Sequence, residues 1–174
     1  MKGYRDFYPH IIRRQPNMAA VIEYRDAGTT RNGTPYLEGR AVPYKTWANV
    51  GAYQEMIWPS CFMESLQREP NLPLLLFHDS RSFPVGIAER WTHKPDGLYG
   101  LWKMDSNDRG REAARQASIG HLGLSIGFQP DPEGTDYRAD ADSLWLTRLA
   151  ARLLEVSLTP TPAYVDAKVT NARL

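Results

Sequence analysis

This chain of 174 residues has a single cysteine, almost no net charge and no long apolar run. The single cysteine, Cys61, excludes an intrachain disulfide and fits a reducing compartment. The 21 Lys and Arg almost balance the 20 Asp and Glu, so we expect no general attraction to nucleic acid or to a membrane surface. Apolar stretches such as 72–77 are far too short to cross a bilayer.

Leader, repeat and metal-binding patterns are missing as well. The stretch 1–15 contains charged residues and no apolar core, so we expect no signal peptide. Four possible ligands, His78, Asp79, His93 and His121, match no zinc spacing. We therefore predict neither a metal nor a cofactor.

The length fits one domain flanked by tails. Residues 1–17 mix aromatic and basic side chains with prolines and are expected to form an N-terminal arm or tail. The folded domain is expected over 18–170, and a short C-terminal tail over 171–174.

Short alternating segments dominate the rest of the chain. Strands are expected over 19–26, 36–44, 52–58, 74–77, 85–94, 97–104, 122–128, 144–149 and 153–158, with a polar loop over 129–135. The Asp96-Gly97 turn predicts a hairpin, and helices are expected over 59–66 and 109–119. Because most strands follow one another without helices, we predict a mainly β (α+β) fold, a closed or nearly closed antiparallel β-barrel with flanking helices.

A serine within the strand 122–128 is the first candidate catalytic residue. The pattern around Ser125 matches the nucleophile elbow of α/β-hydrolases, but a helix precedes this serine and no histidine follows it, which excludes that class. Gly123 and Gly127 share the face of Ser125, so a polypeptide could approach its hydroxyl closely. The alternative is a face of small residues packed beneath a helix.

His78 ends the apolar run 74–77, where an imidazole could reach a cleft and take a hydroxyl proton. A structural histidine bonded to the backbone is the alternative. These two residues, His78 and Ser125, supply a base and a nucleophile on rigid strands.

An acid in the strand 153–158 is the third candidate. Glu155 shares a face with Ser157. Because the strand is otherwise so apolar, we predict that the charge of Glu155 has a partner. It could orient a histidine, or it could form a structural salt bridge with Arg148 or Arg152.

Two further features receive ordinary structural interpretations. Cys61 lies beside Phe62 on the first expected helix and is expected to pack as a small hydrophobic residue rather than act as a nucleophile. The basic side of the second helix, with Arg109, Arg111 and Arg115, is expected to be solvated, with an acidic partner as the second possibility.

Several short blocks of this sequence, in this order and spacing, resemble the prohead (capsid maturation) serine proteases of tailed bacteriophages. They cover about 19–169 and comprise 36–44, 55–62 with 65–66, 74–79, 85–86, 97–98, 124–128, 154–158 and 162–164. The stretch 58–61 departs from the Pro-Gly-Ala/Cys that is more usual at this place in the family.

This resemblance implies a β-barrel surrounded by helices, similar to the herpesvirus assembly proteases. It implies a serine endopeptidase that acts in the host cytoplasm, inside the assembling procapsid. The enzyme would cleave the scaffolding segment of the major capsid protein, and also itself. By their motifs, Ser125 matches the family's nucleophile, His78 its base and Glu155 its acid.

Two alternatives to an active protease stay open on the sequence alone. One is a catalytically idle β-barrel that serves as a capsid scaffold or assembly chaperone; the other is a small binding barrel unrelated to phage. A protease present during shell assembly also requires latency, either through the 1–17 arm occupying the substrate groove or through self-association when copies are confined. Of these two devices we expect confinement.

Overall fold

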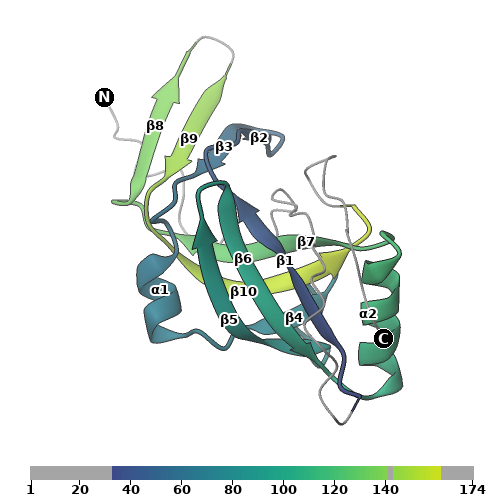
Figure 1. Ribbon diagram of the computed structural model, residues 1–174. Helices are drawn as coiled ribbons and strands as arrows, with labels where there is room; N and C mark the ends of the chain where they lie inside the picture. The colour runs from purple at the N-terminus through teal and green to yellow at the C-terminus, as the bar shows by residue number, and fades with distance from the viewer. Residues whose placement is uncertain (1–32, 141–142, 162–174) are drawn as a thin grey trace.

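The computed structural model describes residues 33–140 and 143–161, which form ten strands and two helices (Figure 1). The expected arm at 1–17, the strand at 19–26 and the tail at 171–174 lie outside the described residues. The elements are β1 (Tyr36–Pro43), β2 (Ala48–Asn49), β3 (Gln54–Ile57), α1 (Met63–Arg68), β4 (Pro73–Leu76), β5 (Gly86–Lys94), β6 (Gly97–Met104), α2 (Asp108–Ser118), β7 (Gly123–Pro130), β8 (Thr135–Ala139), β9 (Leu144–Arg148) and β10 (Ala151–Thr159).

The strands form two sheets. Sheet A has the order β1-β6-β5-β4-β10-β7, and sheet B has the order β2-β3-β9-β8. Most neighbouring strands are antiparallel, as expected, but β4 runs parallel to β10 and β3 runs parallel to β9. Parallel pairing needs a long connection, and each of these pairs is separated by much of the chain.

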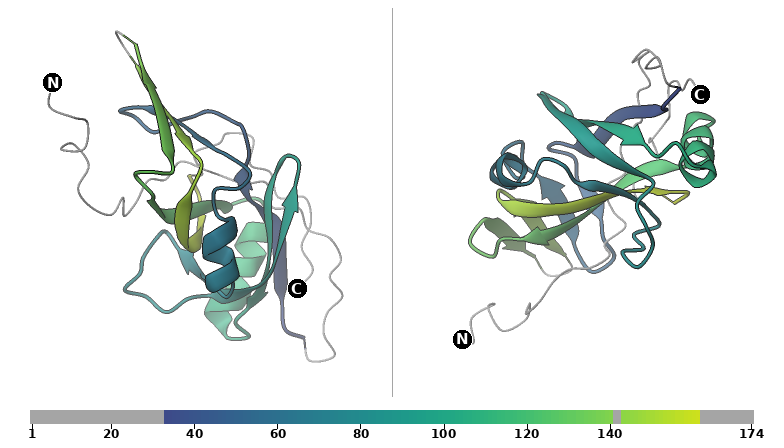
Figure 2. Two further views of the ribbon diagram at one scale, coloured as in Figure 1. Left: turned by 90° about the vertical axis from the view of Figure 1, so that its left-hand side faces the viewer. Right: turned by 90° about the horizontal axis from the view of Figure 1, so that it is seen from below.

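The prediction of a closed or nearly closed barrel is wrong. Sheet A is an open half-barrel, because no ladder joins its edge strands β1 and β7 within the described part of the chain (Figures 1 and 2). The strands that could have extended it pair with one another instead, in the separate sheet B. The mainly β class with two helices is confirmed.

The principal core lies between sheet A and the two helices. Strand residues such as Leu124, Ile126 and Trp102 pack there with Phe62, which directly precedes α1. Helix α2 adds a face of small residues, Ala113, Ala114 and Ala117. The Asn107 side chain accepts a hydrogen bond from the N–H of Gly110 and so caps the start of α2.

Helix α1 begins at Met63, four residues after the predicted start at Pro59. Tertiary hydrogen bonds explain the difference. The Trp58 N–H donates to the carbonyl of Arg148, and the Cys61 carbonyl accepts from the N–H of Ala151. These bonds hold the segment before the helix as a turn against the strands β9 and β10.

Strand β8 was not predicted from the sequence. Most of its residues are exposed, and it pairs only with β9 (Figure 1). An exposed strand needs no apolar alternation, so the usual pattern is missing. The predicted loop at 129–135 is correspondingly shorter, because β7 continues to Pro130 and β8 starts at Thr135.

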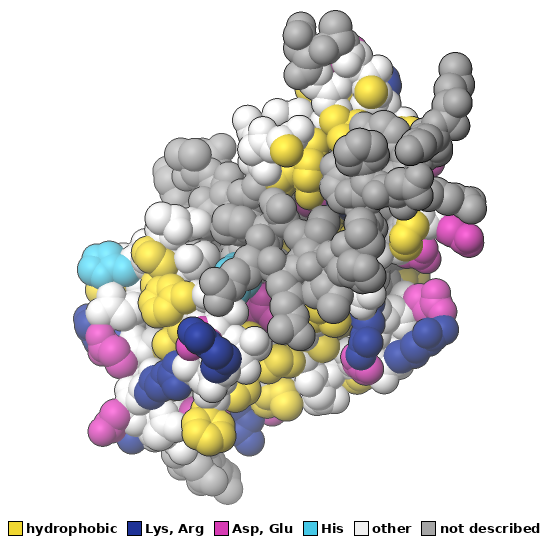
Figure 3. Space-filling view, turned by 180° about the vertical axis from the view of Figure 1, so that it is seen from behind, with side chains coloured by type: hydrophobic (Ala, Val, Ile, Leu, Met, Phe, Trp, Pro, Cys, Tyr) yellow, Lys and Arg dark blue, Asp and Glu magenta, His cyan; other side chains and the backbone are white. Residues whose placement is uncertain are grey.

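Charges of both signs are interspersed on the surface shown in Figure 3, in keeping with the net charge of +1. Among the described residues, no helix is long and apolar enough to cross a membrane.

Candidate active site

Three side chains from different strands and turns of sheet A meet in one hydrogen-bonded line. The His78 Nδ1 atom lies 2.7 Å from Oε1 of Glu155, and His78 Nε2 lies 3.0 Å from Oγ of Ser125. The side chains of His78 and Glu155 are 11% and 13% exposed, and Ser125 is fully buried. His78 is therefore within hydrogen-bonding distance of both other sequence candidates.

The two hydrogen bonds determine which tautomer the neutral imidazole of His78 adopts. A carboxylate is only an acceptor, so the proton on the imidazole belongs on Nδ1, where it is donated to Glu155. Nε2 is then left with a lone pair that accepts the hydroxyl proton of Ser125. This is the arrangement that a general base needs toward an alcohol.

Strand β10 brings the three residues together because it pairs with both β4 and β7. Ser157 on β10 lies opposite Ser125 on β7, and also opposite Leu75 on β4. His78 follows two residues after the end of β4. The parallel pairing of β4 with β10 therefore carries the histidine to the strand segment that holds Glu155.

A bulge in β10 places Glu155. The register with β7 shifts between Leu153 and Glu155, so that Leu153 lies opposite Phe128 and Glu155 lies opposite Gly127. The extra residue lets Leu153 and Val156 both join the core, although three positions separate them. Glu155 is thereby turned to the opposite face, toward His78.

The backbone at the histidine is strained. Phe77 and His78 both have positive φ values, 55° and 58°, in a region that residues with a Cβ rarely occupy. The Phe77 N–H donates to the carbonyl of Leu158, which extends the β4–β10 contact into this turn. The turn places the imidazole between Glu155 and Ser125.

The loop after His78 is closed by Asp79. Its carboxylate accepts hydrogen bonds from the Ser82 hydroxyl and from the backbone and side chain of Arg81. These bonds, led by that of Ser82, lower the pKa of Asp79 to about 2. The carboxylate therefore stays charged throughout the neutral and mildly acidic range.

Ser157 is a fourth polar residue at the site. Its hydroxyl donates to Oε2 of Glu155 at 2.6 Å and accepts from the backbone N–H of His78 at 3.0 Å. Sequence reasoning placed Ser157 on the face of Glu155 but gave it no role. The alternation of the strand 153–158 was the signal that could have found it.

The competing salt bridges for Glu155 do not form. Arg148 donates to Glu55 at 2.6 Å, and Arg152 donates to both carboxylate oxygens of Glu69. The alternative interpretation of Glu155 as the partner of either arginine is therefore wrong.

The other side chains weighed as chemical groups lie elsewhere. His93 Nδ1 is 2.7 Å from the hydroxyl of Tyr44, and His121 Nδ1 is 2.7 Å from the side-chain oxygen of Gln116. Burial raises the pKa of the Cys61 thiol, so this cysteine has little thiolate character. Within 33–140 and 143–161, no group of three or more His, Cys, Asp or Glu could hold a metal ion.

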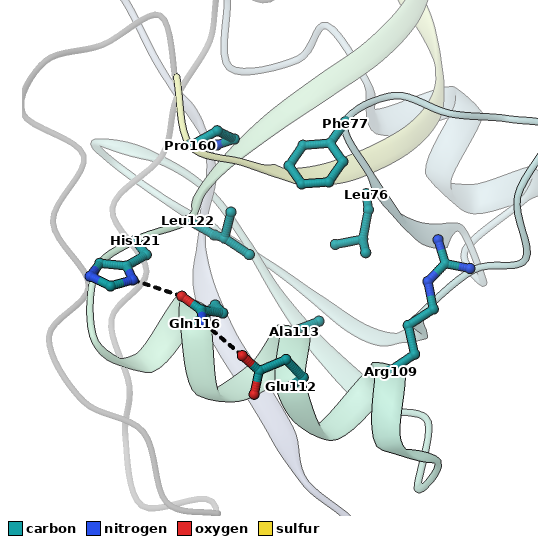
Figure 4. A pocket seen from close by; sticks show the side chains of 9 residues that line it. All are labelled: Leu76, Phe77, Arg109, Glu112, Ala113, Gln116, His121, Leu122 and Pro160. Atoms are coloured by element: carbon teal, nitrogen blue, oxygen red, sulfur yellow. Dashed lines mark hydrogen bonds between the residues drawn. The ribbon is translucent and has the colours of Figure 1, made fainter.

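An apolar pocket adjoins this region between sheet A and α2 (Figure 4). Phe77, the residue before His78, forms one wall together with Pro160, and Leu76 and Leu122 form its floor. The α2 side carries polar groups, among them Arg109, Glu112, Gln116 and His121. Gln116 joins Glu112 to His121 through hydrogen bonds, so the polar side of the pocket is held in place.

Comparison with known proteins identifies the family of the chain. Residues 21–174 match the family model described as Caudovirus prohead serine protease, and the chain belongs to this family of serine peptidases of tailed phages. No curated protein and no solved structure matches the chain. The likeness to herpesvirus assembly proteases therefore stays a prediction.

Proposed function

We propose that this protein is a serine endopeptidase of phage capsid maturation, with Ser125 as nucleophile, His78 as general base and Glu155 as the acid that orients the base. The observation that carries the proposal is the line of two hydrogen bonds from Glu155 through His78 to Ser125. Membership of the prohead protease family supports the reaction class independently.

In the proposed reaction, Ser125 Oγ attacks the carbonyl carbon of the scissile peptide as His78 Nε2 takes its proton. The imidazolium is stabilised by the carboxylate of Glu155. Collapse of the tetrahedral intermediate breaks the C–N bond, and His78 gives the proton to the leaving amine. A water molecule, deprotonated by His78, then hydrolyses the ester on Ser125 and restores the enzyme. Backbone N–H groups or an arginine would stabilise the oxyanion.

The proposed substrates are the scaffolding segment of the major capsid protein and the protease itself. The proposed place of action is the interior of the procapsid in the host cytoplasm, where copies of the protease would associate with one another. The family name supports a role at the prohead stage. Such an enzyme acts where its capsid substrate is concentrated.

A catalytically idle scaffold or assembly chaperone is the alternative function. It would use the same fold but would have no need for a base hydrogen-bonded to Ser125. The 3.0 Å contact between Ser125 and His78 favours the enzyme.

A fluorophosphonate probe tests the proposal directly, because it labels an activated serine. We expect the label on Ser125 of the full chain when the modified peptide is mapped by mass spectrometry. Ser125→Ala should lose the label and all processing of co-expressed major capsid protein while keeping the wild-type circular dichroism spectrum.

Ser118→Ala serves as the matched control, since it also removes a serine hydroxyl, one that donates to the Arg115 carbonyl in α2. This variant should be labelled at the wild-type rate. Cleavage of the capsid protein by Ser125→Ala at full rate would sink the assignment and favour the scaffold.

A further inference from the structure

We propose that Ser157 is a positioning residue of this site, which holds Glu155 and His78 in the geometry that activates Ser125. The inference rests on the proposed function, because it concerns how the same site is kept ready.

Ser157 closes a ring of hydrogen bonds on His78. The imidazole of His78 donates to one carboxylate oxygen of Glu155, Ser157 donates to the other oxygen, and the N–H of His78 donates to Ser157. The histidine is thus held at two points, its ring and its own backbone. Glu155 and Ser157 add a hydrogen-bonded path between these two points of the same residue.

The bond from Ser157 selects the orientation of the Glu155 carboxylate. A glutamate carboxylate rotates about its last torsion with little preference of its own. With Oε2 held by the hydroxyl of Ser157 at 2.6 Å, Oε1 is left facing His78 Nδ1. Loss of the hydroxyl leaves that rotation to be set by the single bond to His78.

The bond to the backbone offsets strain at the same residue. His78 has φ of 58° and follows Phe77, which is also in the left-handed region. Such conformations persist only where the surroundings hold them. Ser157 provides one of these restraints by accepting the N–H of His78 from the neighbouring strand.

The same geometry explains why Ser157 is not itself the nucleophile. Ser157 and Ser125 are paired across β10 and β7, and both are fully buried. A hydroxyl has one proton, and Ser157 donates its proton to Glu155. Among the residues that the structure describes, it is the hydroxyl of Ser125 that lies at Nε2 of His78.

The test compares Ser157→Ala with Ser65→Ala in the full chain. Ser65 is a matched control because its hydroxyl also bridges two groups, the carbonyl of Phe62 and the N–H of Leu153 on β10, away from His78. We expect fluorophosphonate labelling of Ser125 to slow about 10- to 100-fold in Ser157→Ala and to stay at the wild-type rate in Ser65→Ala. Ser157→Thr, which keeps the hydroxyl, should recover most of the rate.

The low-field proton NMR signal of His78 Nδ1–H gives a readout that does not depend on reactivity. We expect it to be sharp in the wild type and in Ser65→Ala, and to broaden through exchange with water in Ser157→Ala. All spectra are recorded below the melting temperature of the least stable variant, so that partial unfolding cannot produce the change.

Suppose that the wild type is labelled at Ser125, and that Ser157→Ala matches Ser65→Ala in labelling rate and in the Nδ1–H signal. This result would overturn the inference but not the proposed function. A folded Ser157→Thr that stays as slow as Ser157→Ala would also overturn it, because the hydroxyl would then not be the active group. A wild type that is never labelled at Ser125 would overturn the proposed function, and the inference with it.

Discussion

The proposed chemistry depends on the proton arrangement of His78. Because Glu155 accepts at Nδ1, the lone pair on Nε2 points at Ser125. The two partners of His78 thus have different roles. Ser125 exchanges a proton with the imidazole ring, whereas Glu155 only orients and stabilises the ring.

Removal of these two partners should therefore have unequal effects. We expect His78→Ala to lower kcat by about 10⁴-fold or more, and Glu155→Gln by less, about 10²- to 10³-fold, because an orienting group transfers no proton. The measurement is single-turnover cleavage of the capsid protein at saturating enzyme. Equal, near-wild-type rates for both variants would contradict the assignment of the base.

Gly127 is required for the placement of Glu155. A Cβ added at Gly127 would lie 2.2 Å from Oε1 of Glu155, the atom that accepts from His78. The end of a glutamate side chain can swing aside at modest cost. We therefore expect Gly127→Ala to cut the cleavage rate about as strongly as Glu155→Gln while lowering stability by only about 1–3 kcal/mol.

Gly134→Ala is the control for this prediction, because the nearest atoms to its Cβ would belong to Ala150, at 2.5 Å, and not to Glu155. It should lose stability without a matching loss of rate per folded molecule. If Gly127→Ala cleaves at the wild-type rate, the contact between Glu155 and His78 is not needed for catalysis.

At the level of elements, the structure of sheet B rests on a buried ion pair. Arg148 on β9 donates to Glu55 on β3 at 2.6 Å and to the Thr135 hydroxyl at 3.2 Å, so one side chain joins three strands. Glu55 is 1% exposed. Burial raises the pKa of Glu55, although Arg148 acts to lower it.

Arg148→Met should therefore destabilise the protein by about 3–5 kcal/mol at neutral pH, because it leaves the charge of Glu55 buried without a partner. The loss should shrink as the pH falls. In the variant, the folded state holds the Glu55 proton more tightly than the unfolded state does, so acid favours folding. Urea denaturation at several pH values measures this, and Glu55→Leu/Arg148→Met should recover much of the stability. A loss that does not change with pH would contradict the account.

At the level of the whole molecule, the described part of sheet A ends in two edge strands, β1 and β7, and β7 carries Ser125. A protease that meets its substrate before the shell is complete must be held inactive until then. Association of confined copies can select the competent conformation, since mass action favours the state that binds. The 1–17 arm, which lies outside the described residues, is the other candidate device.

We expect the activity per mole to rise with protein concentration, both for the full chain and for a variant lacking residues 1–17. The measurement is the initial rate of fluorophosphonate labelling over a wide dilution series, with sedimentation velocity at the same concentrations. Activity that is independent of concentration would remove the confinement mechanism. A large gain in activity on deletion of the arm would favour the arm as the inhibitor.

The sequence by itself determined the local features and the candidate residues. Local patterns predicted β1, β5, β6, β7 and β10, the Asp96-Gly97 turn predicted the β5–β6 hairpin, and the helix expected over 109–119 matches α2 within one residue at each end. These signals depend on neighbours along the chain, and so they can be read without a structure. The family resemblance, which the match over residues 21–174 confirms, likewise rests on short local blocks.

Only the tertiary structure decided how those parts meet. Glu155 is 77 residues from His78, and His78 is 47 residues from Ser125, so no local pattern could fix their contact or exclude the rival arginines. The parallel pairing of β4 with β10, the bulge before Glu155 and the open edge of sheet A depend on non-local hydrogen bonds. Strand pairing is chosen by the burial of whole faces across the chain, and that choice gave Ser157 its place between Glu155 and the backbone of His78.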